Sequence, residues 1–261
     1  MIDRKQFQKP KEKDFFFVWH FQRKISGIVA LILNNTFITP NHVTLLSIIV
    51  GLYSFYYFFI GGAFNDLIGI LLFQLSFLLD CIDGDLSRLR THKGVRYSGA
   101  YFDYLRSILL EPLLPIFLTI GLVMHGYPTF IVVPIIVVSI WKWTPQFSRE
   151  HIVIRQLEHD KELVYNSQLF VDMQKGYGNT SFLITKLISK VVIIFWGLPI
   201  GFMNTITVLA FLGIYFLSPT QYNEIKFIYL ALLTIFYFLH FIKSAVNEYK
   251  LLNEIKKTGE R

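Results

Sequence analysis

The sequence predicts an all-α polytopic membrane protein, with about six transmembrane helices and an N-terminal interfacial amphipathic helix. Of its 261 residues, 53% are hydrophobic and only 16% are charged, a composition that favours a membrane domain over a soluble core. Long apolar runs recur at lengths that suit a bilayer. Basic residues lie mainly at the ends of these runs, so the net charge of +7 indicates membrane lipids, and no nucleic acid, as the partner.

The first forty residues are predicted to form a cytosolic arm followed by the interfacial helix. Residues 15–35 mix aromatic and basic side chains without a charge-free run, a pattern typical of a helix lying at the membrane surface. We interpret Arg23 and Lys24 there as side chains that reach lipid headgroups, the alternative being contact with an acidic substrate. Thr39 and Pro40 are a helix-start signal. Residues 41–261 then form the six-helix membrane domain.

Six spans are predicted, at residues 43–60, 67–79, 98–124, 129–143, 191–217 and 227–242. Turns are expected at residues 61–66 and 218–224. Nearly all Lys and Arg fall in the N-terminal arm, the loop 88–96, the segment 149–190 and the C-terminal tail. The positive-inside rule therefore predicts that both termini and the region around Asp80 face the cytoplasm. The single cysteine, Cys81, excludes an internal disulfide.

Three carboxylates are expected to converge where the second and third predicted spans meet the cytosol. Asp80 and Asp83 are three residues apart and therefore lie on one helix face. In the next helix, Gly99, Asp103 and Ser107 share one stripe at four-residue spacing. Close carboxylates would repel by about 4 kcal/mol per pair at an effective dielectric near 20, so a cation is expected between them.

The ligand chemistry of this site indicates Mg²⁺ or Mn²⁺. Its ligands are oxygen atoms, with no His or Cys alongside, and such sites keep positions open for phosphate oxygens. Gly84 and Gly99 allow a ligand or another helix to approach closely. Arg88 supplies a cationic fork for a phosphate. These parts predict a two-metal diphosphate site, with Asp80, Asp83 and Asp103 as the metal ligands.

Residues 80–88, DCIDGDLSR, and 99–107, GAYFDYLRS, resemble the signature of the CDP-alcohol phosphatidyltransferases. That signature reads D-x-x-D-G-x-x-A-R, then a short gap, then G-x-x-x-D-x-x-x-D. The resemblance implies a six-helix bundle, usually a homodimer, with two divalent cations at its cytosolic face. In the implied reaction an acceptor hydroxyl attacks the CDP-alcohol donor and CMP leaves. It also implies a nucleotide-side contact at Asn41 and Thr44, although such a sequence is equally an ordinary helix start.

Three departures from the signature stand out. Ser87 replaces an alanine, and the gap before Gly99 is two residues longer than usual, which a loop absorbs. The fourth aspartate, which by the resemblance is a metal ligand and the general base, is Ser107. A serine is a poor base at neutral pH and a poor metal ligand. Natural loss of activity, an introduced substitution, or replacement of the base by Glu111 one turn further along would each account for it.

Two functions stay open: an active phosphotransferase of lipid or headgroup synthesis, and a degenerate relative that binds metal and CDP-alcohol without efficient turnover. A transporter is disfavoured because the aspartates fall at helix ends on one side and the chain has no repeat symmetry. The runs FVWHFQRKIS and ITPNHVTLLS are most similar to the branch that joins polyol or inositol phosphates. Basic residues for an acceptor phosphate are numerous: Lys142, Arg149, Arg155 and Lys186.

Overall fold

The computed structural model describes residues 7–8, 18–90, 97–141 and 200–259. Every regular element in these ranges is a helix, which confirms the predicted all-α class. Four helices are long and apolar enough to cross a membrane: Pro40–Ile60, Ala63–Leu89, Leu105–Met124 and Pro219–Lys243. The protein is therefore an integral membrane protein, and four of the six predicted spans have a full-length counterpart among the described residues.

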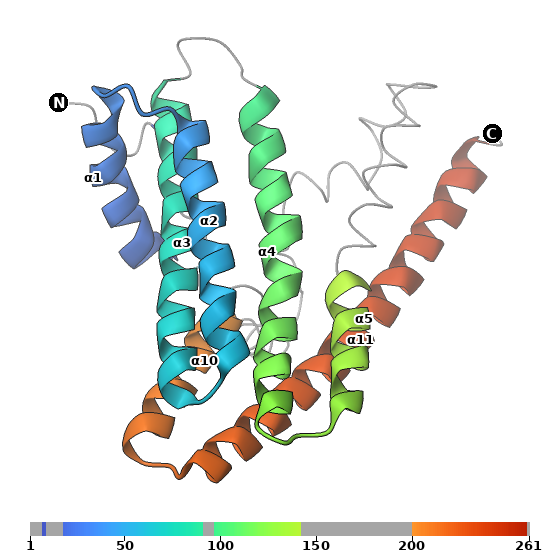
Figure 1. The fold of residues 1–261 in the computed structure, drawn as a ribbon. Helices are drawn as coiled ribbons and strands as arrows, with labels where there is room; N and C mark the ends of the chain where they lie inside the picture. Colours follow the sequence, from blue (N-terminus) through green and yellow to red (C-terminus); the bar gives the residue numbers. More distant parts are fainter. Residues whose placement is uncertain (1–6, 9–17, 91–96, 142–199, 260–261) are drawn as a thin grey trace.

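The predicted interfacial segment forms a short π-helix, η3 (Val18–Gln22), and α1 (Arg23–Asn34). Helix α1 packs beside α3 (Figure 1). Its inner face buries Ser26 and Ala30, whereas Ile25 and Ile32 are exposed on the outer face. The amphipathic character expected from the sequence is present, with the polar part of the inner face turned toward protein.

Helices α2 (Pro40–Ile60) and α3 (Ala63–Leu89) form an antiparallel pair. As predicted, α2 begins with a Thr39 cap: the threonine hydroxyl accepts from the His42 backbone N–H at 3.4 Å. The connection to α3 is tighter than the expected turn at 61–66. Gly61 and Gly62 alone form it, with φ of 73° and 84°, a left-handed conformation that glycine adopts without a Cβ penalty.

Helix α4 (Tyr97–Met124) matches the predicted third span closely and contains Pro112 and Pro115. It packs against α2, where Gly121 lies so near the Phe58 carbonyl oxygen that a Cβ would come within 2.1 Å of it. Small residues at such crossings let membrane helices approach closely. Helix α4 is therefore held firmly against α2 at the end of the bundle remote from the predicted metal site.

The predicted fourth and fifth spans are described only in part. The fourth is seen as η5 (Thr129–Ile131) and α5 (Val132–Trp141), and its last two residues lie outside the described ranges. The fifth is seen as α10 (Ile200–Tyr215), whose predicted beginning also lies outside them. The total of six spans stays a prediction.

The expected turn at 218–224 is wrong. Helix α11 (Pro219–Gly259) already begins at Pro219, so residues 219–224 are helical. Ser218 caps the helix: its hydroxyl accepts from the Gln221 N–H at 3.2 Å, while the Gln221 side chain accepts from the Ser218 N–H at 2.9 Å. This reciprocal pair is a capping box followed by proline at the first helical position, so the Ser-Pro-Thr-Gln sequence is a helix start.

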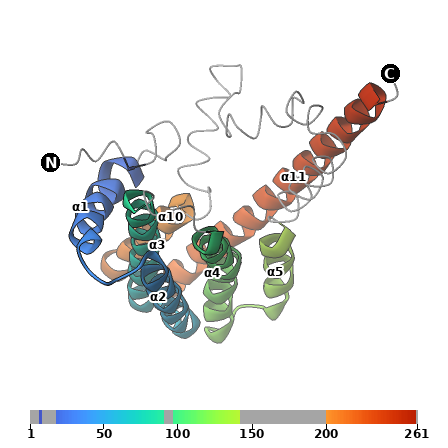
Figure 2. The ribbon, with the colours of Figure 1, turned by 90° about the horizontal axis from the view of Figure 1, so that it is seen from above.

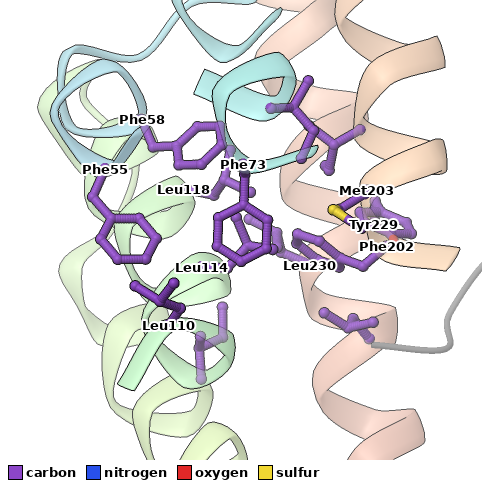
Figure 3. Close-up of a cluster of buried hydrophobic side chains, with 14 of the residues drawn as sticks. Phe55, Phe58, Phe73, Leu110, Leu114, Leu118, Phe202, Met203, Tyr229 and Leu230 are labelled. Atoms are coloured by element: carbon purple, nitrogen blue, oxygen red, sulfur yellow. The ribbon is translucent and has the colours of Figure 1, made fainter. Parts of the chain in front are cut away.

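The hydrophobic core lies between α2, α3, α4, α10 and α11 (Figure 3). A leucine stripe on α4 forms its centre, with Leu110, Leu114, Leu118 and Leu122 all fully buried. Aromatic rings from α2 and α3 pack on one side, and Phe202 and Tyr229 on the other. Helices α2, α3 and α4 stand roughly upright and side by side (Figure 1), and the view from above shows that α11 runs obliquely to them (Figure 2).

A buried ion pair joins the first turn of α3 to α11. Asp66 and Lys226 are both fully buried, and the Lys226 ammonium donates to the Asp66 carboxylate at 2.6 Å. The Tyr222 hydroxyl donates to the same oxygen at 2.6 Å. A buried charge without a partner is strongly unfavourable, so this pair fixes how α11 docks against the end of α3 opposite Asp80.

Asn65 and Lys93 are expected to lie on opposite sides of the membrane. Asn65 is in the first turn of α3, and Lys93 follows three residues after Arg90, where the helix has ended. A helix of 27 residues is about 40 Å long, which exceeds a hydrocarbon core of about 30 Å. Single cysteines at the two positions should therefore react with a membrane-impermeant maleimide from opposite faces of sealed vesicles.

Cys81 is 4% exposed and should stay unlabelled, which makes the unmodified chain the background control. Labelling of both cysteines from one face would mean that α3 does not cross the bilayer.

Candidate functional site

The last turns of α3 present two of the predicted metal ligands, Asp80 and Asp83. Asp83 is 7% exposed, and its carboxylate accepts a hydrogen bond of 2.6 Å from the Thr44 hydroxyl on α2. The same hydroxyl lies 3.1 Å from the Pro40 carbonyl, but its single proton favours the shorter, charged partner. Thr44, predicted as a substrate contact, thus orients the Asp83 carboxylate.

Asp80 faces a residue that the sequence reasoning did not single out, Arg106 of α4. The Arg106 guanidinium lies 3.4 Å from the Asp80 carboxylate, and the arginine side chain is only 2% exposed. It also lies 3.4 Å from the Ser76 hydroxyl and over the Phe77 ring at 5.7 Å. The signal for Arg106 was available, because an arginine inside an apolar span marks a functional site by default.

A third acidic residue, Asp85, is fully buried five residues beyond Asp80 on α3. Its carboxylate accepts hydrogen bonds from Arg23 at 2.8 Å, from the Ser26 hydroxyl at 2.6 Å and from the Gln8 side chain at 3.3 Å. Arg88 donates to it as well. The interpretation of Arg23 as a residue that reaches lipid headgroups is therefore wrong: it is 5% exposed and ion-paired inside the protein.

Arg88, the predicted phosphate ligand, is held in place from two sides. One guanidinium nitrogen donates to Asp85 and another to the Phe7 carbonyl oxygen. The guanidinium folds back over Gly84, where an added Cβ would lie 3.3 Å from it. The side chain is one-third exposed. Gly84 thus leaves room for the arginine, and Asp85 fixes the direction of its fork.

Arg90 fastens the opposite end of α1 to α3. Its guanidinium donates to the Leu33 carbonyl at 2.7 Å, to the Asn34 carbonyl at 3.1 Å and to the Ile38 carbonyl at 2.8 Å. A cation is favourable at these helix-terminal carbonyls. The loop that leads into α2, and so to the half-buried Asn41 in its first turn, is positioned by α3 itself.

The remaining predicted residues lie on α4. Gly99 and Asp103 are within the helix, but the structure does not describe their side chains. Ser107 and Glu111 are half-buried and one turn apart, so the expected stripe is helical throughout. Among the described residues no group of three metal-ligating side chains is close enough to hold an ion, a search that does not include the Asp103 carboxylate. The four candidate acceptor-binding residues after Trp141 also lie outside the described ranges.

The sequence model of one protein family, described as CDP-alcohol phosphatidyltransferase, matches residues 37–155. The match runs from the loop before α2 past the end of α5, and thus contains both motif segments. No curated protein matches the chain.

Removal of the Asp85 carboxylate is expected to destabilise the protein strongly. Asp85→Ala removes the carboxylate partner of the buried Arg23 guanidinium. Breaking one side of a buried ion pair costs about 3–5 kcal/mol. Ser26→Ala, which deletes one hydrogen bond to the same carboxylate, should cost only about 1.5–3 kcal/mol. Unfolding free energies measured by denaturant titration in mixed micelles test both values.

The double variant Arg23→Leu/Asp85→Leu removes both charges and should recover much of the loss. An Asp85→Ala cost below that of Ser26→Ala would show that the pair does not hold α1 in place.

Proposed function

We propose that the protein transfers a phospho-alcohol group from a CDP-alcohol to an acceptor hydroxyl and releases CMP, because residues 37–155 match the sequence model of the CDP-alcohol phosphatidyltransferase family. The transferred group is a phosphatidyl or polyol phosphate, and the reaction belongs to phospholipid or polar-headgroup synthesis. The observation that carries this proposal is the pair of motif carboxylates, Asp80 and Asp83, held at the end of a membrane helix by Arg106 and Thr44.

The donor set fits a hard divalent cation. We propose Asp80, Asp83 and Asp103 as oxygen ligands for Mg²⁺ or Mn²⁺, and members of this family use a divalent metal. When bound, the metal neutralises diphosphate charge and stabilises developing charge on the attacking and leaving oxygens. The Thr44 hydroxyl donates to one Asp83 oxygen at 2.6 Å and so holds the carboxylate in a fixed orientation.

Arg88, Gly84 and Gly99 are proposed to bind the donor diphosphate. The Asp85 carboxylate pre-orients the Arg88 fork, so less side-chain entropy is lost when a phosphate binds. Asn41 is proposed as the nucleotide contact at the first turn of α2. The backbone around Gly84 allows close approach to the donor, although the Arg88 side chain shares that space.

The acceptor must lose a proton, and the position proposed for its base is Ser107. A hydroxyl is too weakly basic at neutral pH for this step. Glu111, half-buried one turn further, is the candidate replacement. The alternative function, a catalytically impaired relative that binds metal and CDP-alcohol without efficient turnover, is favoured by Ser107 alone.

The cytoplasmic orientation and the homodimer are further parts of the proposal. The basic loop after α3 and the basic ends of the chain support placing both termini and the site on the cytoplasmic side. The turns after α2, after α4 and after α10 gather at the other end of the bundle (Figure 1), and they carry few basic residues. A homodimer is proposed from the family resemblance. The arm and interfacial helix, residues 1–40, and the domain 41–261 are proposed as the two units.

Asp83→Ala is expected to abolish the Mg²⁺ or Mn²⁺ dependence of CDP binding. The substitution removes the Asp83 carboxylate from the proposed ligand set, so the metal no longer bridges protein and diphosphate. The Thr44 hydroxyl keeps the Pro40 carbonyl as an acceptor. Calorimetric titration of CDP with and without Mn²⁺ measures the effect, with Thr44→Val as a milder matched variant. Unchanged CDP affinity and unchanged metal response in Asp83→Ala would place the site elsewhere.

The chain is expected to turn over slowly or not at all, and Ser107→Asp should raise the rate by at least about tenfold. A positioned general base contributes about a hundred- to ten-thousand-fold, and the carboxylate would restore it. CMP release from a panel of CDP-alcohols is the measurement. Fast turnover by the unmodified chain that disappears in Glu111→Gln would instead identify Glu111 as the base.

A further inference from the structure

Arg106 continues the stripe of buried leucines on α4. Leu110, Leu114, Leu118 and Leu122 follow it at four-residue spacing, and all are fully buried. A leucine at residue 106 would extend the same packing without a charge. Replacing buried ion pairs by apolar residues is often neutral or stabilising, so packing alone does not account for a guanidinium here.

The surroundings of Arg106 give it one fixed anionic partner and one unused donor. Its guanidinium lies 3.4 Å from Asp80 and 3.4 Å from the Ser76 hydroxyl. Ser76 in turn donates to the Ser47 carbonyl at 2.7 Å, which fixes the serine. The buried Nε of Arg106 has no hydrogen-bond partner among the described residues. A desolvated guanidinium with a spare donor beside a motif carboxylate suits an additional oxygen anion, such as a diphosphate oxygen.

We propose that the Arg106 guanidinium is a built-in cation of the diphosphate site, and that the site consequently takes one divalent ion instead of two. This inference rests on the proposed function of the same site. Arg106 neutralises Asp80 and offers its remaining donor to the donor diphosphate. The divalent ion is held chiefly by Asp83 and Asp103, with Asp80 shared between the ion and the guanidinium.

The charges of the site support this count. Before the donor binds, the carboxylates of Asp80, Asp83 and Asp103 and the Arg106 guanidinium carry two net negative charges, which one divalent cation neutralises. A second ion would need a further carboxylate, and the chain has Ser107 at the position where the sequence signature requires one. A second divalent ion would also have to sit near a fixed positive charge in a poorly screened interior. Arg106 and Ser107 are adjacent residues of one helix, and both favour the same single ion.

The number of bound ions tests the inference without relying on turnover. Purified protein is titrated with Mn²⁺, with and without CDP, and bound ions are counted by calorimetry and by the loss of the free Mn²⁺ paramagnetic resonance signal. The unmodified chain should bind one Mn²⁺ per chain. Ser107→Asp should also bind one, because Arg106 still occupies the second position.

The double variant Arg106→Met/Ser107→Asp should bind two Mn²⁺ per chain, because it removes the fixed cation and supplies the missing carboxylate. Arg106→Met alone, which keeps an unbranched apolar stem but removes the guanidinium, should still bind one Mn²⁺. It should bind CDP at least about tenfold more weakly, since the guanidinium–phosphate contact is lost. Two ions in the unmodified chain or in Ser107→Asp would overturn the inference, whether or not the Met variants fold. Neither Mn²⁺ nor CDP binding in the unmodified chain would instead overturn the proposed function.

Discussion

The buried carboxylate of Asp85 is the constraint on which the end of the bundle that carries Asp80 and Asp83 depends. An ionised carboxylate with no exposed surface is tolerated only when paired and fully hydrogen-bonded, and its partners come from three places: α1, the chain before it, and the next turn of α3. The N-terminal helix α1 is therefore tied to α3 by a buried ion pair and a buried hydrogen bond. Because the same carboxylate fixes Arg88, any movement of α1 would also move the cation proposed to bind the donor.

Helix α3 runs from this end of the bundle to the other. It has a buried, ion-paired aspartate near each terminus and apolar residues between them. Asp66 pairs with Lys226 in its first turn, and Asp85 pairs with Arg23 near its last. Between them Ile70 and Phe73 are fully buried in the core. Apolar packing between helices is weakly directional, since lipid tails are equally apolar. The two ion pairs consequently define the register in which α1 and α11 pack on α3, and the leucine stripe of α4 fills the interior between.

The elements that the sequence predicted well are those whose signals are local. Thr39 and Pro40 mark the start of α2, and the apolar run ending at Met124 marks α4, because caps and hydropathy depend on neighbouring residues. The Ser218 cap was also local but was interpreted as a turn. Arg23 and Asp85 were misread or overlooked for a different reason: they are 62 residues apart, and a charged side chain gives no sign in sequence of whether it meets water, lipid headgroups or a buried partner.

Ser107 shows how far a motif position can be interpreted alone. Consecutive helix residues point about 100° apart, so Arg106 can enter the leucine stripe and reach Asp80 while residue 107 belongs to the face that carries Asp103. The helix face that carries Asp103 has Ser107 where the signature has a carboxylate, and the neighbouring face carries the positive charge of Arg106. Viewed as a single substitution, Ser107 predicts an impaired two-ion site. Viewed with its neighbour Arg106, whose guanidinium lies 3.4 Å from Asp80, it supports the proposed site with a single ion. The lack of a strong base at residue 107 is a separate chemical matter.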